Sequence, residues 1–336
     1  YGANVGSSVD PKLAISWEVA DAWTLRGSAS TTFRGPPQSI LGGTGTALSY
    51  VGKTAAFKAI DTVGNPNLKP ETAVSMNLGL IYQKDNVYAS VDYWSFTFED
   101  SFQTESFNSI VNAYYTTYEC VKDDKAVDNP TCNALRGHIF PVAAHTKGSR
   151  IERIEINWLN GQKIETSGVD ISARYDFDNV MQGLVTVGLD GSYVRKYERG
   201  DLLDINGIKL ADGGDLVGKL NYNLGPSFTS KPQFKINTYV KYETDFHNAS
   251  LIARYVDSYK DEGAPANLAH LKTIDSHLTW DLHYNFTGWD KATLSLSVVN
   301  IADQDPPQAR GDLNYDPFTH NPYGRILKLG FKYTVR

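Results

Sequence analysis

Alternation of apolar and polar residues with a period of two dominates this chain. In the segment 71–82, the even positions are mostly apolar and the odd positions are small or polar. The pattern recurs in 274–286, where Leu278 and Trp280 lie on one face and Asp281 on the other. A period of two is typical of a β-strand whose two faces meet different environments. The chain is therefore predicted to be all-β.

Eleven segments fit this pattern. They are 11–19, 23–33, 71–83, 87–98, 163–177, 184–197, 233–243, 249–259, 274–286, 292–301 and 324–335. The gaps between them alternate without exception between three to six residues and much longer stretches. Outer-membrane barrels alternate in this way, with tight periplasmic turns and long external loops. The alternation predicts a transmembrane antiparallel β-barrel, with the last strand running towards the periplasm.

Aromatic residues lie near the ends of the apolar faces, as at Trp23, Phe33, Tyr175 and Phe177. Aromatic rings gain most at the level of the lipid headgroups, where one end is apolar and the other is wet. A soluble β-sandwich also alternates, but it has no reason to place its aromatics at strand ends. This placement favours a barrel surrounded by outer-membrane lipid over a soluble sandwich.

Composition agrees with a strand-rich protein, because Tyr 20, Phe 14, Trp 6 and Gly 28 stand against Cys 2 and Met 2. The mean hydropathy of −0.35 is compatible with a barrel, since only every second residue of a spanning strand faces lipid. A formal charge of −6 without a stripe of Lys or Arg argues against a nucleic-acid partner.

The two cysteines, Cys120 and Cys132, lie close together in a polar stretch. A disulfide that closes a loop in an oxidising compartment is expected, and two free thiols are the alternative. His277 and His283 are six residues apart, about 20 Å along a strand, and cannot share one metal ion. No metal, cofactor or catalytic centre is predicted.

One motif precedes the strand 71–83. It comprises Asn65, Pro66, Leu68, Pro70 and Glu71. It resembles the "NP-L-PE" segment of TonB-dependent outer-membrane receptors, found where a long external loop re-enters the barrel. Further stretches resemble the same family in the same order. They are 10–13, 33–36, 92–94, 299–303 and 324–325.

The resemblance implies a 22-stranded barrel around an N-terminal plug domain, energised through TonB, ExbB and ExbD. Residues 1–336 would then be the C-terminal portion of the barrel, with its last eleven strands, and the plug, the TonB box and the first half of the barrel have no match here. The implied function is active import of a scarce large solute across the outer membrane of a Gram-negative bacterium. A carbohydrate, another organic oligomer and an iron-siderophore are the solutes in view, and the chain is not expected to be an enzyme.

Charged residues on the polar face are candidates for contacts with the plug or with solute in the lumen. They are Arg26, Asp170, Arg174, Asp190, Asp275, Asp281 and Lys328. Aromatic residues of the loop 100–162 are candidates for stacking on a solute. They are Phe107, Tyr114, Tyr115, Tyr118 and Trp158. Alternatively, the charged residues form ion pairs with one another or with the plug, and the aromatic residues pack the loop onto the barrel.

Two other function classes stay open at this point. A passive porin would share the alternation but would not need the Asn65–Glu71 motif. A secreted β-rich adhesin or enzyme would bury both faces of its sheets, and it would stay soluble without detergent.

The last strand gives one testable expectation. Leu327, Leu329 and Phe331 share the lipid face, so a residue 337 would lie on that face as well. Barrels of this family usually end in an aromatic residue, and we expect the native chain to continue by one such residue. A gene that terminates at Arg336 would refute this.

Overall fold

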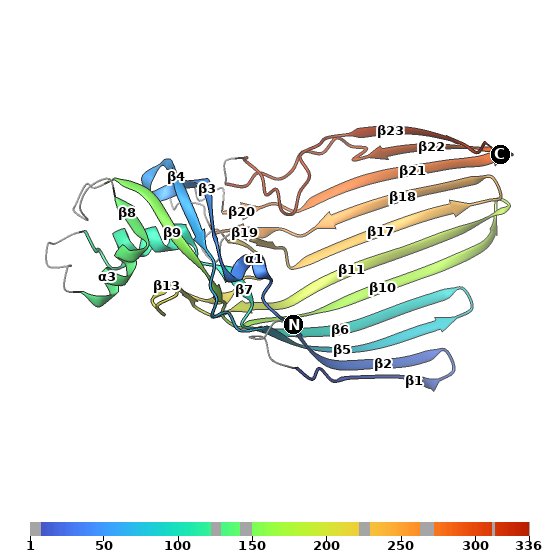
Figure 1. Cartoon of the computed structure of the whole chain (residues 1–336). Helices are drawn as coiled ribbons and strands as arrows, with labels where there is room; N and C mark the ends of the chain where they lie inside the picture. The colour runs from blue at the N-terminus through green and yellow to red at the C-terminus, as the bar shows by residue number, and fades with distance from the viewer. Residues whose placement is uncertain are drawn as a thin grey trace.

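The structure is a computed structural model that describes residues 8–121, 129–141, 150–221, 229–262, 272–310 and 313–335. Eleven long strands lie side by side in chain order in one antiparallel sheet (Figure 1). They are β1 (Lys12–Ala20), β2 (Trp23–Arg34), β5 (Glu71–Lys84), β6 (Val87–Glu99), β10 (Ile164–Val180), β11 (Gly183–Arg199), β17 (Phe234–Glu243), β18 (His247–Val256), β21 (His277–Trp289), β22 (Ala292–Val299) and β23 (Ile326–Tyr333). All eleven predicted segments are therefore strands.

The connections confirm the predicted alternation. Tight turns join the strands at one end of the sheet, and all other elements gather at the opposite end, here called the rim (Figure 1). Several of these turns need a left-handed backbone, as at Asp85 (φ 48°), Met181 (φ 48°) and Gln182 (φ 66°). Short two-residue turns of this kind match the twist of the strands that they join.

The two faces of the sheet differ as the period of two requires. Leu78 is 56% exposed and Leu329 is 77% exposed, and they lie on an apolar face with no protein cover among the described residues. Rings pair near the tight turns of that face. Their centroids lie 4.9 Å apart in Trp23–Tyr82, 4.4 Å in Tyr175–Phe177 and 5.0 Å in Phe286–Trp289. The exposed band with aromatic ends is the surface that a bilayer solvates.

The long connections carry structure that the alternation did not predict. A second sheet has the order β3 (Thr44–Val51), β4 (Ala56–Val63), β9 (Ile151–Asn160) and β7 (Phe102–Thr104), with β8 (Ile139–Pro141) also paired to β9. A third sheet has the order β16 (Thr229–Lys231), β15 (Lys219–Asn221), β19 (Tyr259–Asp261) and β20 (Thr273–Ile274). Shorter pieces are β12 (Leu202–Leu203), β13 (Lys209–Ala211) and β14 (Gly214–Asp215).

Helical turns close the main core of the rim beside the second sheet. They are η1 (Gly52–Thr54), α2 (Phe107–Asn112), η2 (Ala113–Thr117) and α3 (Pro130–Gly137), while α1 (Gln38–Leu41) lies outside this core. Ile60 and Ile154 of the sheet meet Ile110 of α2 and Leu135 of α3 in this core. None of the helices in the described part of the chain has the length and hydropathy to cross a membrane.

The difference between the two faces gives a testable prediction. Replacing Leu78 by Arg places a cation at the middle of β5 on the apolar face, which costs about 2–4 kcal/mol at a bilayer midplane. The matched control, Asn77→Arg, adds the same side chain on the polar face, and its cost should be well under half of that. Equilibrium unfolding of the intact protein from lipid vesicles measures both. Equal costs for the two variants would contradict the assignment of the faces.

Candidate functional site

Inward-facing residues of six neighbouring strands line a polar hollow of about 700 Å³ on the face opposite the apolar band. The lining residues are Arg26, Asn77, Ser90, Asp92, Asp170, Ile171, Ser172, Asp190, Gly191, Ser192, Lys235 and Asn237. The sequence predicted three of them as lumen residues, namely Arg26, Asp170 and Asp190. The strand register explains the grouping, because Asp92 lies opposite Asp170 and Asp190 opposite Asn237.

Most charges in this hollow already have a partner. Arg26 donates from Nε to Oδ1 of Asp92 at 2.7 Å, and a side chain at Gly79 would collide with that carboxylate. Asp170 and Asp190 each accept a hydrogen bond of 2.7 Å from a serine of the neighbouring strand. A carboxylate with one hydroxyl donor keeps further acceptor sites. The wall can therefore accept hydrogen bonds from a plug or a solute in the lumen.

The other predicted lumen residues are spread along the sheet. Arg174 lies 3.8 Å from Asp176 and its guanidinium carbon is 5.5 Å from the ring centroid of Tyr88. Asp281 is buried and accepts from Nε of Arg254 at 2.7 Å and from the backbone N–H of Asn300 at 2.9 Å.

Lys328 lies exposed on β23, opposite Ser297. The predicted strand 274–286 was wrong at its start, because Asp275 lies between β20 and β21 and is not in a barrel strand. The reason is that Thr273 and Ile274 pair with β19 in the third sheet at the rim and do not extend β21. The contact of Asp275 with a plug or a solute stays a prediction.

The motif residues connect the long loops where these re-enter the barrel. Asn65 donates from Nδ2 to the carbonyl of Trp158 at 3.0 Å. Glu71 pairs with Nε of Arg34 at 2.8 Å and accepts from the backbone N–H of Phe102 at 3.1 Å. Leu68 between them is buried. The motif thus joins β2, β5, β7 and β9 at the rim. Its two prolines, Pro66 and Pro70, lie on either side of Leu68.

The predicted loop aromatics lie mostly inside the rim. Tyr114 is buried at 1% exposure, while Phe107, Tyr115 and Tyr118 pack against the same core and Trp158 is half-buried on β9. Cys120 and Cys132 form the expected disulfide, with their Cα atoms 5.3 Å apart. Packing is the visible role of these rings, and contact with a solute stays a prediction.

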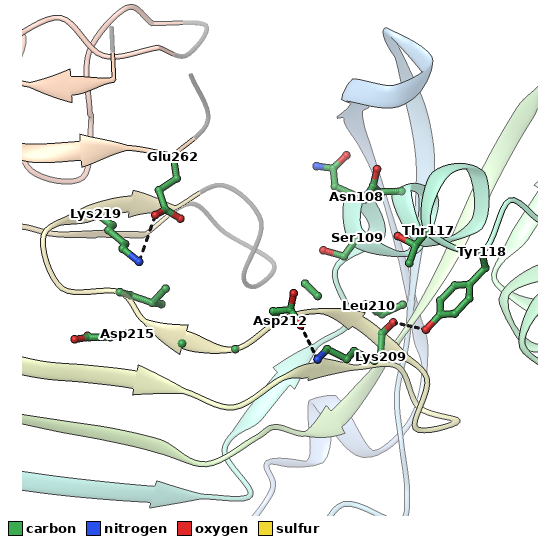
Figure 2. A pocket seen from close by; sticks show the side chains of 15 residues that line it. Asn108, Ser109, Thr117, Tyr118, Lys209, Leu210, Asp212, Asp215, Lys219 and Glu262 are labelled. Carbon is green, nitrogen blue, oxygen red and sulfur yellow. Dashed lines mark hydrogen bonds and ion pairs between the residues drawn. The ribbon is translucent and has the colours of Figure 1, made fainter. Parts of the chain in front are cut away.

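An external pocket of about 650 Å³ lies between α2 with η2 on one side and β13 to β15 on the other (Figure 2). Its lining is mostly polar. The residues are Asn108, Ser109, Asn112, Thr117, Tyr118, Lys209, Leu210, Ala211, Asp212, Gly213, Gly214, Asp215, Leu216, Lys219 and Glu262.

Four interactions set the charge and the shape of this external pocket. Lys209 pairs with Asp212 at 2.6 Å and with Asp201 at 2.8 Å, and these hydrogen bonds raise the pKa of the lysine. Lys219 pairs with Glu262 at 3.3 Å. Tyr118 donates from its hydroxyl to the carbonyl of Lys209 at 3.1 Å and so joins the two walls. Amide, hydroxyl and carboxylate groups in such a lining suit a solute rich in oxygen atoms.

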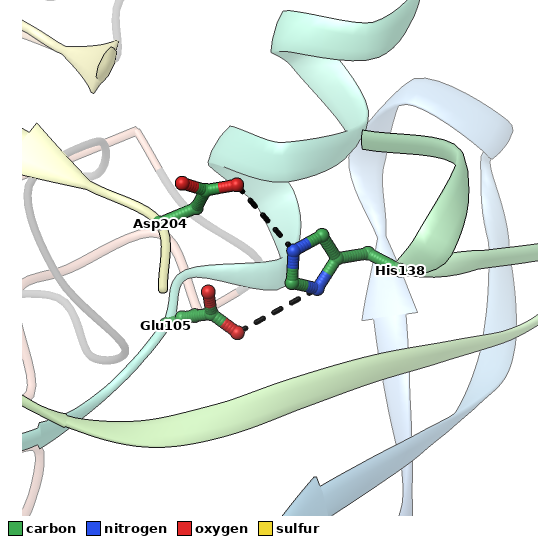
Figure 3. A group of neighbouring side chains, drawn as sticks. All are labelled: Glu105, His138 and Asp204. Atoms are coloured by element: carbon green, nitrogen blue, oxygen red, sulfur yellow. Dashed lines mark ion pairs between the residues drawn. The ribbon is translucent and has the colours of Figure 1, made fainter. Parts of the chain in front are cut away.

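Glu105, His138 and Asp204, which are not in the lining of this pocket, form a buried group that the sequence did not predict (Figure 3). Oε2 of Glu105 lies 3.6 Å from Nδ1 of His138, and Oδ2 of Asp204 lies 3.5 Å from Nε2. The three residues are far apart in the sequence, because Glu105 and His138 lie at distant points of the connection between β6 and β10, and Asp204 lies in the connection between β11 and β17. A spacing motif could not reveal them.

The geometry of this group favours ion pairs over a metal site. The two carboxylates approach different ring nitrogens, whose lone pairs diverge and cannot point at one ion. Nδ1 of His138 also lies 3.0 Å from the carbonyl of Glu155, which fixes a proton on that nitrogen. Burial would lower the pKa of His138, but the hydrogen bond to Asp204 and the charge of Glu105 raise it overall.

A second buried chain of polar groups fastens the loop between β22 and β23 to the rim. The hydroxyl of Tyr259 donates to Oδ2 of Asp316 at 2.6 Å and lies 3.0 Å from Nε2 of His320. Nδ1 of His320 in turn lies 3.2 Å from Nδ1 of His277. His283 bonds instead to the hydroxyl of Ser297 at 3.0 Å, so the two histidines of β21 have separate partners.

Comparisons with known proteins agree on one kind of barrel. Residues 1–301 match the family described as "TonB dependent receptor-like, beta-barrel". A probable TonB-dependent siderophore receptor, PirA of Acinetobacter baumannii, is 23% identical over 333 residues, which make up 98% of this chain and 39% of the relative. An iron-regulated outer membrane virulence protein of Vibrio cholerae is 32% identical over 82 residues, which make up 24% of this chain and 11% of that protein.

Solved structures resemble the fold over most of the chain. The siderophore receptor PirA from Acinetobacter baumannii matches with a TM-score of 0.58 at 18% identity, covering 98% of this chain and 41% of that one. A variant of the ferric enterobactin receptor PfeA from Pseudomonas aeruginosa matches with a TM-score of 0.60 at 15% identity and the same coverage. The chain thus spans about two fifths of the length of these structures.

The chain of Tyr259, Asp316 and His320 predicts a response to acid. Burial, reinforced by His277 and Lys235, lowers the pKa of His320 to about 4, so the folded protein holds this ring neutral. The resulting stabilisation is complete above the ordinary histidine pKa of about 6.5 and is lost as the pH falls through 4.

We expect hydrogen exchange in 313–325, corrected for its intrinsic pH dependence, to speed up between pH 6.5 and pH 4 in the intact protein. A His320→Phe variant should lose this dependence, because it has no ring nitrogen to protonate. The same acid response in that variant would assign the effect to other groups.

Proposed function

The chain belongs to the TonB dependent receptor-like β-barrel family, and from that premise we propose that it forms part of an active importer of ferric siderophores. Barrels of this family lie in the outer membrane of Gram-negative bacteria, and their family is one of transporters rather than enzymes. The relatives named as siderophore receptors support the proposed substrate class.

One observation carries the proposal. A single sheet presents an apolar band to one side and a polar hollow to the other, with a polar pocket at the rim where the long connections gather. A route for a polar solute needs this arrangement, because the solute must be captured outside and then pass a wall with which it can form hydrogen bonds. Neither face of such a sheet suits a secreted sandwich, which would bury both.

We also propose that further strands complete the barrel in the intact protein. β1 and β23 are the two edges of an eleven-stranded sheet, and bacterial single-chain barrels have an even number of strands. The shares of the relatives' length fit eleven strands of a 22-stranded barrel with a plug inside it. In this proposal, Asp170 and Asp190 contact the plug, and TonB with ExbB and ExbD supplies the energy for transport.

The external pocket is proposed as the place where the solute first binds. Its amide and hydroxyl groups at Asn108, Asn112 and Thr117 offer donors to the carbonyl, carboxylate and phenolate oxygens typical of iron chelators. Its two lysines are already paired with carboxylates, and with Asp215 the lining carries a formal net charge of minus one. Tyr118 is the one predicted loop aromatic that lines this pocket.

Uptake of iron tests the proposal directly. The full-length protein with its native plug is produced in cells that lack other siderophore receptors, and uptake of radiolabelled ferric enterobactin and of a ferric hydroxamate is measured. An Asn112→Trp variant fills the pocket from α2, and uptake should fall at least about tenfold, equivalent to ~1.4 kcal/mol. Thr44→Trp on the exposed β3, outside the pocket, is the matched control and should leave uptake unchanged.

The outcomes separate the rival solutes and mechanisms. Uptake that persists without TonB would indicate a passive channel. Import of a labelled oligosaccharide but of neither chelate would replace the siderophore by a carbohydrate. Full uptake in the Asn112→Trp variant would remove the external pocket from the route.

A further inference from the structure

We propose that His138 acts as a proton-controlled clamp that holds the two walls of the external pocket together. The importance of this clamp for uptake rests on the proposed function, in which that pocket receives the solute. The clamp itself is a property of the folded rim and can be measured without any solute.

Glu105 and Asp204, whose carboxylates lie beside His138, are the residues from which the two walls of the pocket begin, and they are here called the roots of the walls. Glu105 directly precedes Ser106, the N-cap of α2, and α2 with η2 forms one wall. Asp204 directly precedes the turn that leads into β13, and β13 begins the other wall. A change in how these two residues are held therefore moves the walls at their base.

Each root is fixed to its own wall by backbone donors. Oδ1 of Asp204 accepts from the N–H groups of Asn206 at 2.9 Å and of Ile208 at 2.6 Å, which shapes the turn before β13. Oε2 of Glu105 accepts from the backbone N–H of Asn157 on β9 at 2.7 Å. Oε1 of Glu105 also accepts from the N–H of Ile205 at 2.6 Å, so one bond between the roots does not involve the histidine.

His138 joins the roots from a third segment. It is the C-cap residue of α3, and the disulfide of Cys132 with Cys120 ties that helix to the end of η2. Its ring faces the carboxylates of Glu105 and Asp204 at 3.6 and 3.5 Å, and β9 contributes the carbonyl of Glu155 (Figure 3).

Charge makes this contact depend on a proton. Glu105, His138 and Asp204 are all buried, and within the described ranges no lysine or arginine bonds to any of them. On the same segment as His138, Arg136 instead bonds to Asn133 and to the carbonyl of Cys120, and on β9 Arg153 pairs with Asp61. With a protonated ring the group carries a net charge of minus one, and with a neutral ring two buried carboxylates repel each other.

The direction of the pH response follows from two pKa values. Because the pKa of His138 is raised by its partners against burial, its stabilisation is complete below about pH 6.5 and is lost as the pH rises through the raised value. Burial would raise the pKa of Asp204, but the bonds to His138 and Ile208 lower it overall, so its stabilisation is lost only in acid. The clamp is closed between these limits and opens on the alkaline side.

Hydrogen exchange of the full-length protein in detergent or nanodiscs tests the clamp. After correction for the intrinsic pH dependence, protection of 107–118 and 202–216 should fall roughly threefold or more between pH 6 and pH 9. A His138→Gln variant keeps a donor for Glu155 but cannot take up a proton, so its protection should be low at both pH values. His283→Gln, which alters a histidine on the polar face of β21, is the matched control and should behave as the parent.

A second measurement keeps the proposal falsifiable if His138→Gln fails to fold. Titration of the His138 ring by NMR in the parent should give a pKa above 6.5, and Asp204→Asn should lower it. Constant protection from pH 6 to pH 9, or a pKa for His138 at or below 6.5, would overturn the clamp. If the parent shows no pH response but Asn112→Trp still blocks uptake, the clamp alone is rejected. If the parent shows the expected pH response but Asn112→Trp leaves uptake unchanged, only the role of the pocket is rejected.

Discussion

Pairing of backbone groups inside a bilayer is the constraint on which this structure depends. Hydrocarbon offers no hydrogen-bond partner, so each N–H and C=O of a spanning strand must bond to a neighbouring strand. The eleven strands satisfy this by lying in chain order with antiparallel neighbours. Because alternate side chains then point to opposite faces, one register decides at once which residues meet lipid and which meet the polar hollow.

At the rim, backbone groups can also bond to water, so the chain there is not restricted to the strands of the barrel. Water and protein surround the long connections, which form a sheet of their own, short helices and a disulfide-linked core. The Asn65–Glu71 motif lies at this transition and joins four strands by hydrogen bonds and an ion pair. Its visible role is therefore to anchor the loops on the barrel, which explains why such a segment belongs where a loop re-enters.

Charged groups are distributed according to what surrounds them. On the polar face, Arg26 with Asp92 and Arg254 with Asp281 form pairs across strands, whereas Asp170 and Asp190 accept hydrogen bonds from serines. In the rim, Glu105, His138 and Asp204 are buried completely, so a single proton changes the charge of the group where solvent cannot screen it. The polar face of the barrel sheet thus has carboxylates that can accept hydrogen bonds, whereas the buried group in the rim has charges that depend on one proton.

The sequence by itself determined the barrel strands, their faces and the tight turns, because a period of two and loop lengths are local properties that lipid and backbone pairing impose directly. It placed Arg26, Asp170 and Asp190 on one wall for the same reason. It favoured a disulfide between Cys120 and Cys132 but left two free thiols open. Only the tertiary structure decided the second sheet, the burial of Tyr114, the exclusion of Asp275 from β21 and the meeting of Glu105, His138 and Asp204. These depend on contacts between residues up to about a hundred positions apart, and no local pattern along the chain encodes such contacts.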